Sequence, residues 1–461
     1  MEFKRVQLTL LMILALVAGM ECPADTHYVS LSGTNNSPYL NWADAATDVT
    51  WAVTAAGAND TVLVTNGTYF PSNRMYATAA ITLRSVSGRD ATIINGANNT
   101  DLCAALSSAS SVIDGFTVTN CNNTLVYGTI QIRNARNCIF VNNSSKGGII
   151  WSYNNSQYDG SITNCIFKNN TGLLGGGIYA SQGTVAHTSS ITIAGCHFEG
   201  NRASTYYGGA CDLRVGRNIV SNCMIINNRA SEYGGGIFIS SSSTNNLVVN
   251  CTITGNVCVG HISRGLGGGI YTGGKTTIRD CSIIGNVTTN RGGGVWGTNV
   301  TIQNCLVARN ISLTNTGGGV WMTNGLIESC TIVSNQAAVA GGGVYVDGGL
   351  DSDGTNNIIY FNTAANGANF TNTSVNTGMN YSCVIPAVNG TGNITNNPLL
   401  LDLDGGNYHL RMNSPCVNAG TNQDWMNGAV DVDGVPRIRY GIVDMGAYET
   451  ILRQGNIYRV R

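Results

Sequence analysis

The sequence predicts an all-β protein, a right-handed parallel β-helix solenoid with a short N-terminal capping helix and an irregular C-terminal segment. Three observations lead to this class. A short phrase recurs between residues 138 and 362, its apolar positions alternate as in strands, and glycine occupies intervals where a helical repeat would have helix formers. A regular repeat of this length indicates coils that stack and share one core.

The recurring phrase is Cys-x-(Ile/Val/Phe)-x-x-Asn, followed by a Gly run, a branched apolar residue and usually an aromatic residue. Its copies begin 24 to 31 residues apart. They start at Cys138, Cys165, Cys196, Cys223, Cys251, Cys281, Cys305 and Cys330, and a ninth copy has Asn357 in place of Cys. Successive coils should therefore superimpose equivalent positions of the phrase.

The spacing of apolar residues within one copy predicts two corners. Val300 and Ile302 are two apart, the period of a strand with one buried face. Cys305 follows Ile302 by three, so the chain must turn just before it. Cys305 and Val307 alternate again, and Asn310 comes three later, at a second corner. Stacking such coils gives parallel sheets, and the general hand of parallel crossovers gives a right-handed winding.

The repeated Asn is interpreted as structural. Its amide can bond exposed backbone at a bend, and Asn tolerates left-handed dihedral angles. Stacked from coil to coil, these amides would form a hydrogen-bonded ladder. The alternative is a leucine-rich repeat, which has a similar spacing. It is disfavoured because the apolar positions hold Ile, Val, Phe and Cys, and because Gly, Thr and Asn fill the intervals.

The ends of the chain depart from the repeat. Residues 42–56 show helical spacing before Gly57 and predict a cap over the open core. We divide the chain into a cap with first coils at 27–115, repeats at 116–396 and a C-terminal segment at 397–461.

Residues 1–20 have the pattern of a signal peptide. Lys4 and Arg5 precede an apolar stretch from residue 6 to residue 17, which is short for a membrane span. A retained N-terminal anchor is the alternative. We expect an exported, monomeric protein without a membrane span after signal cleavage. Only 11% of the 461 residues are charged, the net charge is −1, and no basic stripe is present, which argues against a nucleic-acid partner.

Fifteen cysteines in an exported chain would usually suggest disulfides. Eight of them share one repeat position, so in-register stacking places them about 4.8 Å apart with parallel side chains. A disulfide needs Cβ atoms about 3.8 Å apart and converging bonds. The sequence therefore predicts a ladder of buried free thiols, with oxidation of some pairs as the alternative.

Three C-terminal phrases resemble a known family. SPCVNAG at 414–420, DVDGVPR at 431–437 and VDMGAYE at 443–449 look like the choice-of-anchor Q region of exported bacterial parallel β-helix proteins. The Asn and Gly-run repeats resemble those of the chlamydial polymorphic outer-membrane proteins. The resemblance implies the fold, export and often surface attachment. Residues 450–461 are too short for an anchor helix, so both a secreted and a cell-surface location are expected.

The residue after each Gly-run aliphatic should point away from the core. These outward positions form one predicted stripe: Trp151, Tyr179, Phe238, Tyr271, Trp296, Trp321 and Tyr345. Aromatic faces on a flat sheet suit sugar rings, so we expect a polysaccharide or a cell-surface glycan as ligand. The alternative is that loops cover the stripe, or that the rings only stack to stabilise the sheet.

One coil interrupts the stripe with Asp212, and Arg214 two residues later faces the same way. This pair is a weak catalytic candidate, acting on a uronic acid; a plain ion pair is the alternative. Catalysis would make the protein a polysaccharide lyase or glycoside hydrolase acting on uronate-containing glycans. The paired Asp and Gly-His-Gly phrases of β-helix polygalacturonases are missing, as is the Asp cluster of pectate lyases. Binding is therefore the favoured function.

No cofactor is expected, and the five His show no metal-ligand spacing. Three Asp-x-Asp-Gly phrases could bind Ca²⁺, but each lacks the other oxygen ligands of a calcium loop. They contain Asp351 and Asp353, Asp402 and Asp404, and Asp431 and Asp433. Asp-Gly pairs are mainly turn formers, which is the alternative interpretation.

Overall fold

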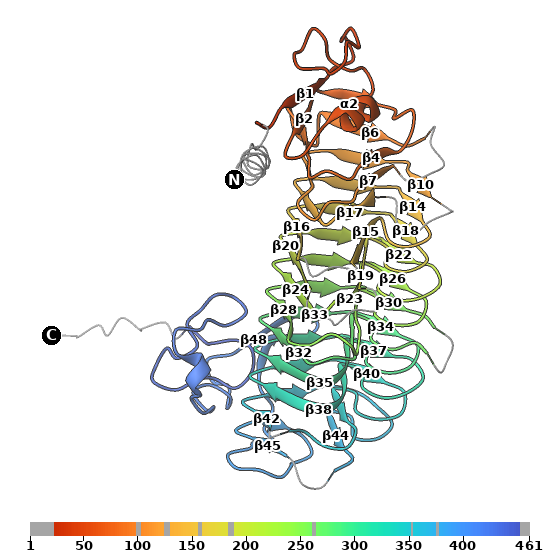
Figure 1. Ribbon diagram of the computed structural model, residues 1–461. Helices are drawn as coiled ribbons and strands as arrows, with labels where there is room; N and C mark the ends of the chain where they lie inside the picture. Colours follow the sequence, from red (N-terminus) through yellow and green to blue (C-terminus); the bar gives the residue numbers. More distant parts are fainter. Residues whose placement is uncertain are drawn as a thin grey trace, which may run out of the picture.

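A computed structural model confirms the predicted fold class: the chain is a parallel β-solenoid (Figure 1). The structure describes residues 23–97, 103–123, 130–154, 159–182, 189–260, 264–351, 354–374 and 378–451. The predicted signal at 1–20, Asp353, residues 452–461 and the side chain of Trp151 lie outside this description. The right-handed winding and the domain boundaries stay predictions.

Each regular coil contributes short strands to three long parallel sheets. One coil consists of β32 (Thr276–Arg279), β33 (Ser282–Ile284), β34 (Val287–Thr288) and the first half of β35 (Val295–Gln303). The next coil pairs with it in register through the second half of β35, β36 (Leu306–Ala308), β37 (Ile311–Ser312) and β38 (Val320–Glu328). Equivalent residues of successive repeats are therefore neighbours.

The two predicted corners are present, each made by one residue in the left-handed conformation. Asn304, with φ 54°, precedes Cys305, and Arg309, with φ 57°, precedes Asn310. Most coils have Asn or Gly at these corners, the residue types that adopt positive φ at least cost. One detail of the prediction is wrong: the left-handed residue is the one before the repeated Asn, whose own amide is buried.

The repeated Asn side chains form the predicted ladder. The backbone N–H and Nδ2 of Asn228 donate to Oδ1 of Asn256 at 2.9 and 3.0 Å. Nδ2 also donates to the carbonyl oxygen of Phe198 at 3.0 Å. Asn228 is fully buried, so these bonds satisfy polar groups that water does not reach.

The predicted ladder of buried free thiols is confirmed for the eight repeat cysteines. Each lies between two corners and donates weakly to backbone; the Cys223 thiol, for example, donates to the Ser221 carbonyl at 3.2 Å. A column of stacked rings fills the interior beside the thiols in the earlier coils. Phe140 lies 4.9 Å from Phe167, which lies 4.7 Å from Phe198.

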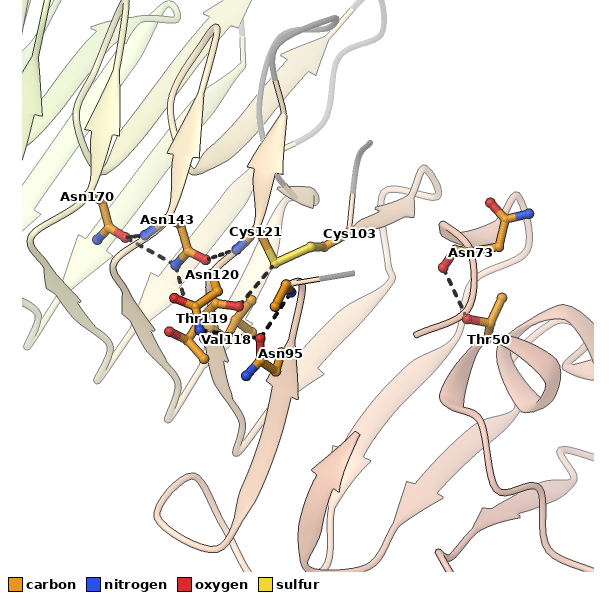
Figure 2. Close-up of a disulfide and its surroundings, with 11 residues drawn as sticks. Thr50, Asn73, Asn95, Cys103, Val118, Thr119, Asn120, Cys121, Asn143 and Asn170 are labelled. Carbon is orange, nitrogen blue, oxygen red and sulfur yellow. Dashed lines mark hydrogen bonds between the residues drawn. A yellow bond between two sulfur atoms is a disulfide. The ribbon is translucent and has the colours of Figure 1, made fainter. Parts of the chain in front are cut away.

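A disulfide that the sequence analysis did not predict joins Cys103 and Cys121 (Figure 2). Asn122 pairs with Ser144, so Cys121 stands where the next coil has Asn143. Oδ1 of Asn143 accepts the backbone N–H of Cys121 at 3.0 Å. The disulfide thus lies at the N-terminal end of the asparagine ladder.

The capping helix is present but shorter than predicted. Helix α2 spans Val49–Ala55 instead of 42–56 and lies at the N-terminal end of the solenoid (Figure 1). Asp48 is the N-cap and accepts from the backbone N–H of Thr50 at 2.8 Å. The preceding residues are held in a turn, in which Asp44 bonds Asn41. This turn chemistry overrides the helical spacing.

The C-terminal segment packs against the side of the later coils (Figure 1). It contains the antiparallel hairpin of β47 (Leu400–Asp402) and β48 (Asn407–Leu410) and the 3₁₀ helix η1 (Asp424–Met426). Arg437, within this segment, is fully buried. Its guanidinium donates to the carbonyl oxygen of Gly446 at 2.9 Å and lies 3.3 Å from the carboxylate of Glu449. Within the described ranges, no helix has the length and apolar character to cross a bilayer.

Candidate functional site

The residues of the predicted stripe occupy one column on the outer face of the largest sheet. Their strands are β15 (Ile150–Asn154), β19 (Ile178–Gln182), β23 (Cys211–Arg214), β27 (Ile237–Ile239), β31 (Ile270–Thr272), β35, β38 and β41 (Val344–Val346). The register aligns Trp151, Tyr179, Asp212, Phe238, Tyr271, Trp296, Trp321 and Tyr345. We call this set the aromatic column. Its seven coil spacings span roughly 33 Å.

Four successive rings of the aromatic column stack on one another, from Phe238 to Trp321. Trp296 lies 4.4 Å from Tyr271 with an angle of 1° between planes, and 5.0 Å from Trp321 with an angle of 3°. The coil spacing equals the separation of stacked aromatic rings, so adjacent faces cover each other. The expectation that the ring faces meet solvent holds only in part, because Tyr179, Tyr271, Trp296 and Tyr345 are half-buried. Phe238 and Trp321 are only 7% and 5% exposed.

A second column lies beside the first and was missed by the sequence analysis. It consists of residues that directly precede the Gly runs, and we call it the flanking column: Tyr207, Tyr233, Leu266, Arg291 and Thr316. Parallel bridges join its first four members, and the backbone N–H after Arg291 donates to the carbonyl of Thr316. The sequence signal that could have revealed this column is a Tyr directly before two of the Gly runs, Tyr207 and Tyr233.

Rings of the flanking column cover the aromatic column. Tyr207 stacks on Phe238 at 4.6 Å, and Tyr233 stacks on Tyr271 at 5.0 Å. The Gly runs that follow the flanking column let the backbones of successive coils stack closely. A Cβ on Gly235 would lie 2.2 Å from the carbonyl oxygen of Gly268, well inside van der Waals contact.

Asp212 and Arg214 form a bidentate ion pair within this face. Nε and Nη2 of Arg214 donate to the two oxygens of Asp212, both at 2.7 Å. The Asp212 side chain has no exposed surface, whereas that of Arg214 is 28% exposed. The guanidinium carbon lies 5.3, 5.1 and 5.6 Å from the ring centres of Tyr179, Tyr207 and Phe238. The cation is therefore fixed by one carboxylate and three rings.

Burial raises the pKa of Asp212 to about 6, although Arg214 acts to lower it. Both oxygens of Asp212 are bonded and hidden, so this carboxylate cannot touch a substrate. Nη1 of Arg214 has no hydrogen-bond partner among the described residues. The pair therefore presents N–H donors to the outside and keeps its acid inside. This arrangement suits anion binding rather than acid–base catalysis.

Another charged pair lies near Tyr207 and Tyr233. Glu232 forms an ion pair with Arg264, and its carboxylate contributes to raising the pKa of both tyrosines, after burial. The pair is neutral overall.

The Asp-x-Asp-Gly phrases behave as turns where the structure describes them. Oδ1 of Asp402 accepts the backbone N–H of Gly405 at 2.8 Å. Oδ1 of Asp431 accepts the backbone N–H groups of Asp433 and Val435. Asp353, the second carboxylate of the first phrase, lies outside the described residues. Among all residues that the structure describes, no cluster of three or more His, Cys, Asp or Glu side chains could hold a metal ion.

A cavity of about 390 Å³ lies in the C-terminal segment. His409 lies 2.5 Å from an oxygen of Asp433 and packs on the ring of Tyr448. Glu449 lines the same cavity, and burial raises its pKa to about 8 despite the opposing charge of Arg437. Most other lining residues are apolar, so this cavity offers no second outward cation.

No protein-family model and no curated protein matches this chain. Among solved structures, pectate lyase Pel9A has a TM-score of 0.39 and 14% identity, covering 93% of this chain and 98% of its own. A rhamnogalacturonan lyase has a TM-score of 0.34 and 11% identity, covering 84% and 95%. PfbA, a surface adhesin of Streptococcus pneumoniae, has a TM-score of 0.33 and 11% identity, covering 73% and 88%. These likenesses define no family for the chain, and the choice-of-anchor Q resemblance stays a prediction.

Proposed function

We propose that the protein is exported and binds a polysaccharide or cell-surface glycan along the aromatic column, with Arg214 contacting an acidic sugar. The observation that carries this proposal is the geometry of Arg214. Its guanidinium is held by a fully buried acid and three aromatic rings, yet its Nη1 has no hydrogen-bond partner in the described part of the chain.

The physical argument rests on preorganisation. An arginine side chain normally loses rotamer freedom when it binds a ligand, and this loss weakens the complex. At Arg214 the side chain is already ordered, because Asp212 bonds two of its nitrogens. The remaining N–H groups can donate charge-assisted hydrogen bonds to a carboxylate. A hexuronic acid offers that carboxylate on a ring that can lie along the flat face.

Catalysis remains the alternative proposal, as a lyase or hydrolase of uronate-containing glycans. A hydrolase of this type needs two carboxylates that flank the scissile bond. Asp212 does not meet this need, because it is buried and both its oxygens bond Arg214. Binding is therefore the function that the geometry supports better.

Arg214→Ala tests the proposal on an array of acidic and neutral glycans. We expect the native protein to retain acidic glycans and the variant to lose them. Arg229→Ala is the matched control, because Arg229 is an exposed arginine of β26 (Arg229–Ala230), in a different sheet. Unchanged retention by the Arg214 variant would reject the proposal.

Each retained glycan is then assayed for new reducing ends and for the ultraviolet absorbance of an unsaturated product. Neither signal should appear above the blank. Turnover that disappears in Arg214→Ala but persists in Arg229→Ala would replace binding with catalysis as the function of this face.

A further inference from the structure

Arg291 is a second cation on the same face, three coils beyond Arg214. It belongs to the flanking column, whose first member, Tyr207, contacts the guanidinium of Arg214. The Arg291 guanidinium carbon lies 5.5 Å from the ring centre of Trp321. Among the described residues no acidic side chain forms an ion pair with it. Its charge is therefore uncompensated.

Several side-chain atoms of Arg291 and of residues near it in the chain or in the next coil are buried, and among the described residues they have no hydrogen-bond partner. They are Nε of Arg291 itself, Nε1 of Trp296 and Trp321, Oγ1 of Thr316 and Oδ1 of Asn290. Trp321, Asn290 and Thr316 are only 5%, 6% and 7% exposed.

A buried polar group without a partner is unfavourable, so several of them together call for a partner from outside. Four of the five atoms belong to groups that can donate a hydrogen bond, and one of the four is Nε of Arg291 itself. Anionic oxygens can accept hydrogen bonds from these donors and also compensate the positive charge of Arg291.

The two cations share one track along the solenoid. Three coil spacings separate Tyr207 from Arg291, which is roughly 14 Å. Tyr233 and Leu266 fill the two coils between them. The nearby Glu232 is paired with Arg264 and adds no net charge to the track. A chain of sugar rings running parallel to the axis could reach both guanidinium groups.

We propose that Arg291 is a second anion-binding site, and that the ligand is a linear polysaccharide with repeated carboxylate or sulfate groups. This inference rests on the proposed function of Arg214. The polymer lies parallel to the solenoid axis and contacts both arginines, with the edges of the aromatic column between them. Linking two weak contacts through one chain raises the affinity above that of either contact.

The test compares a polymer with a short fragment by isothermal titration calorimetry. Polygalacturonate supplies carboxylates, dextran sulfate supplies sulfates in a second arm, and digalacturonate is too short to contact both arginines. Arg291→Gln should weaken binding of the preferred polymer about tenfold, the loss of one charge-assisted hydrogen bond. Digalacturonate should occupy two sites on the native protein and one site on either single variant.

The outcomes separate this inference from the proposed function. If Arg214→Ala loses the polymer while Arg291→Gln binds it as tightly as the native protein, the second site is rejected and the first stands. If neither polymer binds the native protein, both are rejected. Arg291→Lys keeps the charge and should restore part of the affinity. Unchanged circular dichroism and thermal midpoint exclude unfolding as the cause.

Discussion

At the scale of single residues, Asp212 shows how one substitution within a repeat changes the property of a surface. The equivalent positions in neighbouring coils hold rings, and the carboxylate takes their place without gaining exposure. Its burial would be very unfavourable if it were alone. Arg214 compensates the charge with two short hydrogen bonds and turns its remaining donors outward.

The raised pKa of Asp212 predicts that glycan binding depends on pH. Its pKa is about 6, so below this value the carboxyl group is neutral and Arg214 carries an uncompensated charge. Affinity for an acidic glycan should therefore rise severalfold as pH falls from 7.5 to 5, because sugar carboxylates stay ionised there. The free energy of unfolding should also increase as pH falls, because a raised carboxyl pKa favours the folded state at low pH.

Asp212→Asn is the control for this pH dependence. The amide keeps the shape of the side chain but cannot titrate, so its affinity should be flat over the same range. Titrations at fixed ionic strength measure both proteins. A native affinity that falls as pH decreases would contradict the assignment of Arg214 as the contact.

The aromatic column was predicted from the sequence, with covering loops as the alternative, but the residues that cover it were not. Alternation of side chains along a strand predicts which residues point outward. It does not predict what lies over them. Tyr207 and Arg291 reach the column from stretches of variable length between the repeated Asn and the Gly run, where no period exists to guide a prediction. The buried polar atoms of Arg291 and its neighbours that have no partner among the described residues are likewise recognisable only in three dimensions.

At the scale of elements, short strands were predictable because corners recur at fixed positions. The helix boundary was not, because the helical spacing of apolar residues continues into a turn fixed by Asn41 and Asp44. Ala46 is buried in that turn as a bridge partner of Val29, not on a helix. The buried residues of this turn therefore have the spacing of a helical face without forming a helix.

The stacked phenylalanines predict a large loss of stability on truncation. Phe167 is fully buried between Phe140 and Phe198. Phe167→Ala should lower the free energy of unfolding by about 3–5 kcal/mol, through lost burial and the cavity left behind. Phe70→Ala is the control, because Phe70 is 51% exposed and its loss should cost within about 0.5 kcal/mol. Urea unfolding measures both; equal effects would contradict the stacked core.

The docking of the C-terminal segment should weaken as pH rises. Burial raises the pKa of Glu449 to about 8, so the folded state favours the protonated acid. Stability from this group is full below its unfolded pKa and declines as pH rises toward 8. Glu449→Gln should flatten that decline. Thermal midpoints from pH 5 to pH 8.5 measure it, and a native midpoint that increases over this range would contradict the buried acid.

At the scale of the whole molecule, the repeat makes the interior continuous from coil to coil. The sequence predicted this because Cys, branched aliphatic and Asn positions recur together, and each has one place in the coil. The structure of the C-terminal segment was harder to predict, because its phrases do not repeat. Its buried Arg437 and its packing against the side of the solenoid follow from contacts between residues far apart in the chain.

The thiol ladder predicts how the intact protein reacts with an alkylating reagent. Twelve described cysteines are free and buried. The native protein should resist labelling at these positions, and unfolding without a reductant should label all twelve, as read by peptide mass spectrometry. Cys103 and Cys121 should react only after reduction. Thiols that remain unlabelled after unfolding would show that the ladder is oxidised.

The central claim is that an acidic polysaccharide lies along this face, parallel to the solenoid axis. A crystal structure of the protein with a bound uronate oligosaccharide tests it most directly. We expect one sugar carboxylate at Nη1 of Arg214 and another anionic group at Arg291, with the polysaccharide chain between them crossing successive coils. A saccharide bound on another sheet, or in the C-terminal cavity beside His409, would contradict it.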